Sequence, residues 1–338
     1  MAEIRISRDR AERLAALVSE MNYTPRSFHR PEMFPDAEDE YIASNFFFFL
    51  TAIDHRTHIS RKQRYRAYIN NILYRGSDLM YVLAKSMQDK VPDFFTAAKL
   101  KDIDAGKVQE VFDLPDGIQI RDPGQRAMLL RDAAKILIKN YDADIRSLLR
   151  RASGYLRRED NSGILQQLTS IKAYQDPLEK KSLLLVKLLR RRALLEVKDK
   201  EHLSVPVDNI LMLVALRSGL IEVVEDMLRH QLLEGMLLDA QDVFLLRRAT
   251  RDAFETVSNI SALDPDVLDD LLWIYGREFN SEVPTVNNVD KSSPLLDARI
   301  DDSDALKQFV RFINGLDEDA PANSYRYLDP NVPETWYF

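Results

Sequence analysis

Hydrophobic residues recur at helical spacing along most of the chain. Leu, Ala, Arg, Lys and Glu dominate the apolar stretches, and glycine is scarce, with 10 among 338 residues. This pattern is typical of an all-α protein. We find no strand-like alternation of polarity in the first half, so we expect a helical segment from Arg61 to Lys90, with a break at Gly76. Ser7 would cap a first helix. Further helices are expected at about 39–54, 105–112, 126–141, 221–233, 239–257, 264–279 and 304–314.

Two segments near the middle of the chain predict helices that are apolar almost all round and therefore buried. The first follows Asp-Pro-Leu-Glu at 176–179, where the aspartate would act as the N-cap and the proline would begin the helix. The second follows Val-Pro-Val-Asp at 205–208 and ends before Gly219. Lys181 stands at the start of the first helix and Asp208 at the start of the second. Both starts therefore carry residues capable of acid, base or amine chemistry.

Residues 45–50 read Asn-Phe-Phe-Phe-Phe-Leu. Four consecutive phenylalanines cover every direction around a helix, so we expect this helix to be central in the fold. Core packing alone would account for the rings. One or two of them could instead line a pocket and stack on a flat ligand.

The polar stretch 159–163 suggests a boundary between an N-terminal helical half, 1–160, and a second half, 161–280. Residues 281–338 are rich in Asn, Asp, Ser and Pro, apart from one expected helix. This C-terminal part ends in Trp-Tyr-Phe. We expect an extended arm that is anchored by these aromatic residues.

Composition excludes several kinds of chemistry. The chain has no cysteine, which excludes disulfides, thiolate nucleophiles and cysteine-ligated metal centres. His55 and His58 are three residues apart, but no third ligand is suggested nearby, so we predict no metal and no cofactor. The sequence has no Gly-x-Gly-x-x-Gly fingerprint and no phosphate-binding Gly-Lys-Ser/Thr loop. The charged amino terminus and the short apolar run 183–189 predict a cytoplasmic protein that does not span a membrane.

The net charge of -7 gives no general attraction to nucleic acid. Basic clusters at 61–66, 150–158 and 190–192 could still form a basic face, although solvated helix faces are the usual explanation for such runs. Lys180 and Lys181 could likewise be solvated residues of a first helical turn. A nucleophilic role for Lys181 would require a lowered pKa.

Asp208 is the strongest catalytic candidate. Partial desolvation beside a buried helix would raise its pKa, while the helix N-terminus would oppose that rise. A plain N-cap would use the same residue in the same place.

Residues 205–208, with Lys181 at the head of the preceding helix, resemble the active-site region of helix-hairpin-helix DNA glycosylases, including the 8-oxoguanine glycosylase/lyases. In that group the lysine attacks the sugar and the aspartate supports cleavage of the base–sugar bond. The glycine-containing hairpin by which most members grip DNA has no counterpart in residues 175–179.

A longer stretch, from about 39 to 279, resembles the queuosine salvage proteins, which are queuosine 5′-phosphate N-glycosylases. Asp208 falls where that family carries a catalytic aspartate, but Asn209-Ile210 stands in place of the family's Tyr-Arg. The other similar segments are Asn45-Phe46-Phe47-Phe48-Phe49, Phe244-Leu245-Leu246-Arg247 with Glu255, and Asp269-Asp270-Leu271-Leu272-Trp273.

Both resemblances imply an all-α, helix-hairpin-helix glycosylase-like core of two packed helical halves. The leading hypothesis is an N-glycosidase that cleaves the base–ribose bond of a small, queuosine-type nucleoside or nucleotide. Asp208 would stabilise the oxocarbenium-like state, and Asp269 would bind or protonate the departing base. The remaining substrate-binding residues would be Asn45, Phe46, Phe48, Phe49, Arg247 and Trp273.

Two alternatives stay open. A DNA glycosylase/lyase would excise a damaged base of the 8-oxoguanine type, with Lys181 as nucleophile and nucleic acid as partner. A non-catalytic helical protein would bind nucleotides or a protein partner. The sequence leaves the base, the sugar and the oligomeric state open.

Overall fold

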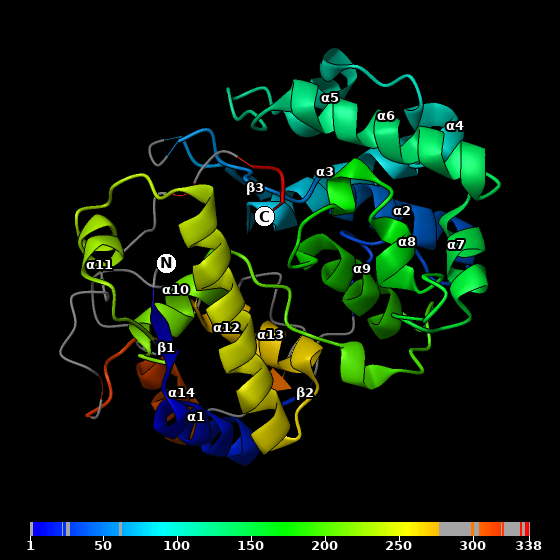
Figure 1. Cartoon of the computed structure of the whole chain (residues 1–338). Coiled ribbons are helices and arrows are strands. Elements are labelled where there is room, and N and C mark those ends of the chain that lie inside the picture. The colour runs from blue at the N-terminus through cyan, green and yellow to red at the C-terminus, as the bar shows by residue number, and fades with distance from the viewer. Residues whose placement is uncertain are drawn as a thin grey trace. The chain divides into compact units, whose positions relative to one another are not determined.

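The computed structural model describes residues 3–21, 23–24, 28–60, 63–276, 299–300, 304–318, 320, 332 and 335–337. This part of the chain is predominantly α-helical, which confirms the predicted class (Figure 1). It contains fourteen α-helices and three antiparallel sheets of two strands each. None of these helices is both long enough and apolar enough to cross a membrane.

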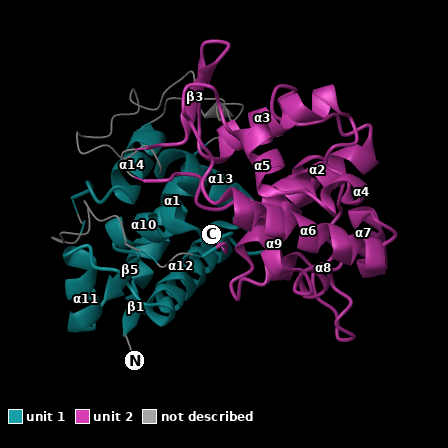
Figure 2. Ribbon diagram, turned by 90° about the horizontal axis from the view of Figure 1, so that it is seen from above, with its two compact units in different colours: residues 1–26, 203–291, 295–335 teal, residues 27–202, 292–294, 336–338 magenta. Residues whose placement is uncertain are grey.

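The chain divides into two compact units (Figure 2). Unit 1 comprises residues 1–26, 203–291 and 295–335, and unit 2 comprises residues 27–202, 292–294 and 336–338. This division differs from the boundary expected near residue 160. Strand β1 (Ile4–Ile6) pairs with β5 (Ile221–Val223), and helix α1 (Arg8–Glu20) packs on α12 (Ala240–Ser261). The amino terminus therefore belongs to the same unit as the later helices, through contacts that are remote in sequence.

Unit 2 is built around α2 (Glu40–Ala52), which packs against α6 (Pro123–Asn140), α7 (Ile145–Ala152) and α9 (Lys180–Arg191). Its four phenylalanines are fully buried, as predicted for a central helix. Phe46 meets Phe95 edge to face with ring centroids 5.3 Å apart, and Phe48 stacks on Tyr174 at 5.4 Å. The other elements of unit 2 are β3 (Arg66–Ile69), β4 (Ile72–Arg75), α3 (Ser77–Lys90), α4 (Ala97–Leu100), α5 (Ala105–Phe112), α6 (Pro123–Asn140), α7 (Ile145–Ala152), α8 (Ile164–Leu168), α9 (Lys180–Arg191) and the 3-10 helices η1 (Lys172–Tyr174) and η2 (Lys200–His202).

The prediction of a helical segment from residue 61 is wrong over residues 66–75, because these residues form the β3–β4 hairpin. Asn70 and Asn71 at its tip have φ angles of 50° and 63°, the left-handed values that a tight hairpin turn requires and asparagine tolerates. The helix from Ser77 follows the predicted break at Gly76. The Asn-Asn pair between two short β-branched and aromatic runs was the signal for this hairpin.

Helix α9 begins at Lys180, later than the expected start at Asp176-Pro177. Asp176 accepts hydrogen bonds from the backbone amides of Leu178 (3.2 Å) and Lys180 (3.0 Å) and thereby closes a turn ahead of the helix. Glu179 then takes a left-handed conformation with φ of 58°, so regular helix starts only after it.

Unit 1 is a helical cluster in which α10 (Asn209–Arg217) packs on α12 and on α13 (Pro265–Gly276). The helix expected over 221–233 is half right, because residues 221–223 form strand β5 and only Asp226–Leu233 is helical. The other elements of unit 1 are β2 (Tyr23–Thr24), α11 (Asp226–Leu233), β6 (Arg299–Ile300) and α14 (Asp304–Ile313).

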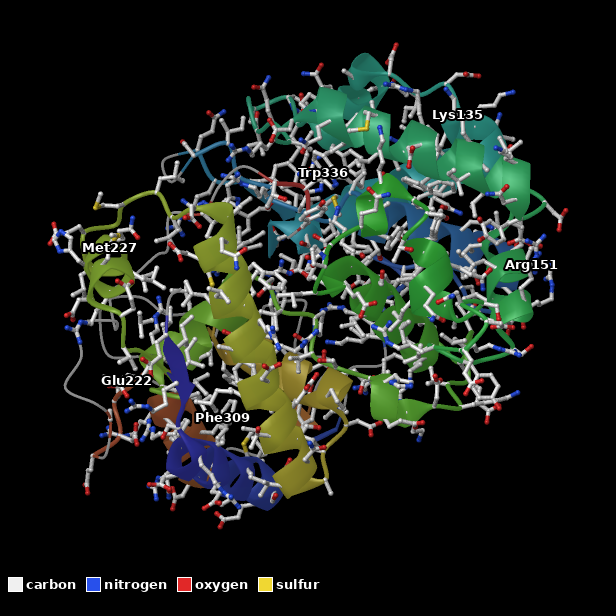
Figure 3. All side chains as sticks on the ribbon, viewed as in Figure 1. Lys135, Arg151, Glu222, Met227, Phe309 and Trp336 are labelled. Carbon is white, nitrogen blue, oxygen red and sulfur yellow. The ribbon has the colours of Figure 1, made fainter. Side chains whose placement is uncertain are left out.

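The predicted C-terminal arm lies mostly outside the described residues. Its one expected helix is present as α14, which carries Phe309 (Figure 3). This side chain is fully buried, and its ring lies edge to face against Tyr275 with centroids 5.9 Å apart. In unit 2, the indole N–H of Trp336 donates to the carbonyl of Lys172 (3.2 Å). One of the terminal aromatic residues is thus anchored by a hydrogen bond.

Helices α10 and α13 approach so closely at Gly276 that a methyl group there would lie 2.4 Å from Cγ2 of Val214. We predict that Gly276→Ala lowers the free energy of unfolding by about 1–3 kcal/mol, because this contact would be overpacked. Gly124→Ala is the matched control, since that helical glycine has open space around its Cα. It should be neutral or stabilising by about 0.5–1 kcal/mol. Urea unfolding followed by circular dichroism would measure both, and equal effects would contradict the packing argument.

Candidate functional site

Asp208 ends an extended segment of unit 1 that is fixed to α12 at two points. The hydroxyl of Ser204 donates to Oε1 of Glu255 (2.7 Å). Arg247, which is 3% exposed, donates to the carbonyl of Val207 through Nη2 (3.0 Å) and Nε (3.3 Å). The backbone immediately before Asp208 is therefore held in place.

The carboxylate of Asp208 caps the N-terminus of α10. Its Oδ1 accepts hydrogen bonds from the amides of Ile210 (2.8 Å) and Leu211 (3.0 Å). The positive end of the helix dipole also favours negative charge at this position. The N-cap expected at Asp208 is confirmed, and its side chain is half-buried, so solvent can reach it.

Trp273 adds a third donor to this carboxylate. Its indole Nε1 lies 3.2 Å from Oδ2 of Asp208, and it reaches there from α13, which packs against α10. Two amides and one indole N–H thus stabilise the ionised carboxyl group and fix its orientation. Among the predicted site residues, Asp208 and Trp273 are brought into direct contact.

A second carboxyl group lies on the same helix as Trp273. Asp269 is four residues earlier in α13, so both side chains share one helix face, one turn apart. Asp269 is 5% exposed and is flanked by the buried carboxyl groups of Asp266 and Asp270. The same side of α13 therefore carries the indole that contacts Asp208 and a buried acid.

The other predicted residues belong to unit 2. Asn45 is buried, and its side-chain amide donates to the carbonyl of Tyr41 (2.9 Å) and to Oδ1 of Asp144 (3.3 Å). This bond links α2 to the residue that caps α7. The rings of Phe46, Phe48 and Phe49 are fully buried among other aromatic rings. Within unit 2 these side chains form core.

Lys181 is fully buried in unit 2. Its Nζ donates to the carbonyl of Ala52 at 2.6 Å and lies 3.2 Å from Nδ1 of His55. Lys180 is also buried, and its Nζ donates to the carbonyl of Asp54 (3.2 Å) and lies 3.9 Å from the carboxylate of that residue. The idea that the two lysines are solvated is wrong, because both turn inward to the end of α2.

Arg126 completes this group of cations and was missed in the sequence. It is fully buried and donates to the carbonyls of Ile53, His55 and Arg56. Lys180, Lys181 and Arg126 together satisfy the carbonyls at and just after the C-terminus of α2. Cations are favoured there by the negative end of the helix dipole.

The buried environment lowers the pKa values of Lys181, His55 and Arg126. Burial, and then the neighbouring charge of Lys180, lowers the pKa of Lys181 well below its ordinary value. Burial, then the charges of Arg126 and Lys181, lowers the pKa of His55 well below its ordinary value. Burial lowers the pKa of Arg126 to about 10. The sequence offered one hint of this cluster, the two lysines ahead of an apolar helix.

The two histidines considered as a metal pair take different partners. Nε2 of His55 lies 3.1 Å from Oε1 of Gln125, whereas Nδ1 of His58 accepts a hydrogen bond from the amide of Tyr65 (3.1 Å). Among the described residues, no group of three or more His, Asp or Glu side chains could hold a metal ion.

No protein-family model matches this chain, and no curated protein matches it. A functional assignment therefore depends on the geometry around Asp208 and Lys181.

The buried histidine predicts how stability changes with acidity. Because the pKa of His55 is lowered in the folded protein, unfolding takes up a proton below pH of about 6.5. Stability should therefore fall as the pH falls through this region, by up to about 1.4 kcal/mol per pH unit, until the folded-state pKa is passed. Urea unfolding of wild type and His55→Gln between pH 7 and 5 would measure the effect.

The variant should lose this part of the pH dependence. His202→Gln, which changes an exposed histidine of the same unit, is the control and should keep the wild-type slope. Identical slopes for wild type and His55→Gln would show that His55 is not the titrating group.

Proposed function

We propose that the protein is an N-glycosidase that cleaves the base–ribose bond of a modified nucleoside or nucleotide of the queuosine type, on a helix-hairpin-helix glycosylase-like core. One observation carries the proposal. A half-buried carboxylate, Asp208, stands at the N-terminus of an apolar helix and is oriented by two backbone amides and the indole of Trp273. An ionised group held in this way suits a reaction that develops positive charge on a sugar.

In the proposed reaction, the bond between C1′ and the base nitrogen breaks, and its electron pair leaves with the base. The sugar becomes oxocarbenium-like, and the negative charge of Asp208 stabilises it. A water molecule then attacks C1′ and loses one proton, while the departing base takes up one proton. Asp269, on the same face of α13 as Trp273, is the group proposed to bind the base or to supply that proton.

Trp273 has a different role here from the substrate binding that the resemblance implied. Its N–H donates directly to the carboxylate, so we assign it as a positioning residue that fixes the orientation of Asp208. Arg247 acts further back, because it holds the carbonyl of Val207 rather than the carboxylate itself. Both residues would thus act by fixing the position of Asp208 and would not contact the substrate themselves.

The lyase alternative has one observation in its favour and one against it. The lowered pKa of Lys181 gives a larger neutral fraction of the amine, and a nucleophile must be neutral. Its Nζ is, however, fully buried and bonded to the carbonyl of Ala52, so the described conformation does not present it to a substrate. The hydrolase is therefore the proposal that the geometry favours. A non-catalytic protein would need Asp208 only as an N-cap. The substitution Asp208→Asn distinguishes this alternative from an enzyme.

Asp208→Asn should reduce base release by about 100-fold or more, because the amide lacks the negative charge that stabilises the transition state. Asparagine caps a helix as well as aspartate does, so the fold should be retained. Base release from candidate modified nucleotides, followed by liquid chromatography, would measure the loss.

Asp239→Asn is the matched control, since Asp239 caps α12 in the same unit. It should keep full activity. Equal activity of Asp208→Asn and wild type would remove Asp208 from the mechanism. Borohydride trapping of a DNA adduct that disappears in Lys181→Met, but not in Lys180→Met, would favour the lyase instead.

Trp273→Phe keeps an aromatic ring but removes the N–H donor. We expect kcat to fall about 10-fold with little change in KM, because a hydrogen bond to a charged group is lost and Asp208 is less well oriented.

An NMR readout tests the same contact without any activity. The chain has two tryptophans, so the indole N–H signal of Trp273 can be assigned by its disappearance in Trp273→Phe. Its chemical shift should change in Asp208→Asn, because the carboxylate that accepts its hydrogen bond is replaced by a neutral amide. A shift that does not respond to that substitution would rule out the positioning role.

A further inference from the structure

The β3–β4 hairpin of unit 2 lies in a segment whose charged residues are all basic. Between His55 and Ser77 the sequence contains no aspartate or glutamate, although the whole chain has a net charge of -7. The basic residues of this segment are Arg56, Arg61, Lys62, Arg64, Arg66 and Arg75.

The hairpin sorts its side chains onto two faces. Tyr74 points inward and is 2% exposed, whereas Arg66 is exposed and Tyr68 is 74% exposed. Arg66 lies directly opposite Arg75 in the antiparallel register, and Tyr68 lies opposite Leu73. Residues that face each other across a strand pair share one face, so the outer face carries two arginines and an exposed ring.

The base of the hairpin is firmly attached to unit 2. The hydroxyl of Tyr65 donates to the carbonyl of Phe112 (2.7 Å), and the backbone amide of Tyr65 donates to Nδ1 of His58 (3.1 Å). The amide of Gly76 donates to the carbonyl of Tyr65 (2.8 Å) and closes the ribbon. Figure 2 shows the hairpin extending from the rest of unit 2. The outer face is therefore presented on a support that is already ordered.

Several arginines in or near the other two basic clusters are paired or buried. In the α7 region Arg146 pairs with Asp144 (2.9 Å) and Arg157 with Glu179 (2.6 Å). Arg192 is buried against the carbonyls of Phe28 and Pro35.

Arg64 and Arg66 make no ion pair with any described residue. The hairpin thus presents exposed arginines that the described part of the protein does not neutralise, next to the exposed ring of Tyr68.

We propose that the β3–β4 hairpin binds single-stranded nucleic acid. Arg64, Arg66 and the arginine opposite it would contact phosphates, whose counterions are released on binding. Tyr68 would stack on a base, because an exposed ring between cations offers the surface on which any base can pack. This inference uses residues apart from Asp208 and Trp273 and does not depend on the proposed activity.

Fluorescence anisotropy with a fluorescein-labelled oligothymidylate, in a low-salt buffer, tests the proposal on the full chain. Binding should weaken with salt, with a slope of log K against log salt of about -0.7 for each phosphate contacted. Arg64→Gln combined with Arg66→Gln should weaken binding about 10-fold or more and make the slope shallower by about 1.4, which corresponds to two contacts.

Tyr68→Ala should weaken binding about 10-fold through the loss of stacking, whereas Tyr68→Phe keeps the ring and should bind as wild type does. The matched charge control is Arg150→Gln combined with Arg151→Gln on exposed positions of α7, where the labelled Arg151 lies at the outer surface (Figure 3). It should leave binding nearly unchanged. Circular dichroism would verify that every variant is folded.

Three results would overturn the proposal. One is equal weakening by the α7 control, which would indicate general charge attraction. Another is that the wild type and the hairpin variants bind the oligonucleotide equally well, or that neither binds it. The third is preferential binding of phosphatidylserine vesicles over the oligonucleotide, lost in the hairpin variants, which would assign this face to an anionic membrane surface.

Discussion

The structure of unit 2 depends on how the carbonyl groups at the end of α2 are satisfied. This helix is buried along its whole apolar length, and so its last carbonyls cannot turn to water. Lys180, Lys181 and Arg126 donate to them instead. Three buried cations are costly, and the lowered pKa of Lys181 reflects that cost. The carbonyls and the helix dipole compensate them, and in doing so they fix α6 and α9 against α2.

In unit 1 the end of a buried helix is also satisfied by a charged side chain, but here the charge is negative. There the N-terminus of α10 carries the unsatisfied amides, and the carboxylate of Asp208 accepts from two of them. The indole of Trp273 then uses the second carboxylate oxygen. Asp208 thus accepts from a side chain of another helix in addition to its two backbone partners.

Local rules explain the elements that were predicted correctly. Ser7 accepts from the amide of Arg10 at the start of α1, and α5 covers the predicted 105–112. Both follow from capping and periodicity, which act within one helical turn. The hairpin at 66–75 was missed because its four-residue strands are short and a helical pattern fits such runs equally well. The Asn-Asn turn favours the hairpin over a helix, because both asparagines take a left-handed backbone conformation.

The sequence by itself determined the helical class and the buried character of α2, because spacing is local, and it offered an N-cap as one of two roles for Asp208. Only the tertiary structure decided what the candidate residues touch. Lys181 turned out to face the carbonyl of Ala52, and Trp273 the carboxylate of Asp208, through packing between helices that are distant in the chain. Arg126 and His55 gave no local signal, because their burial arises only when α2, α6 and α9 come together. Non-local packing is not encoded in any single stretch, and for that reason the site's residues could be nominated in advance but their roles could not.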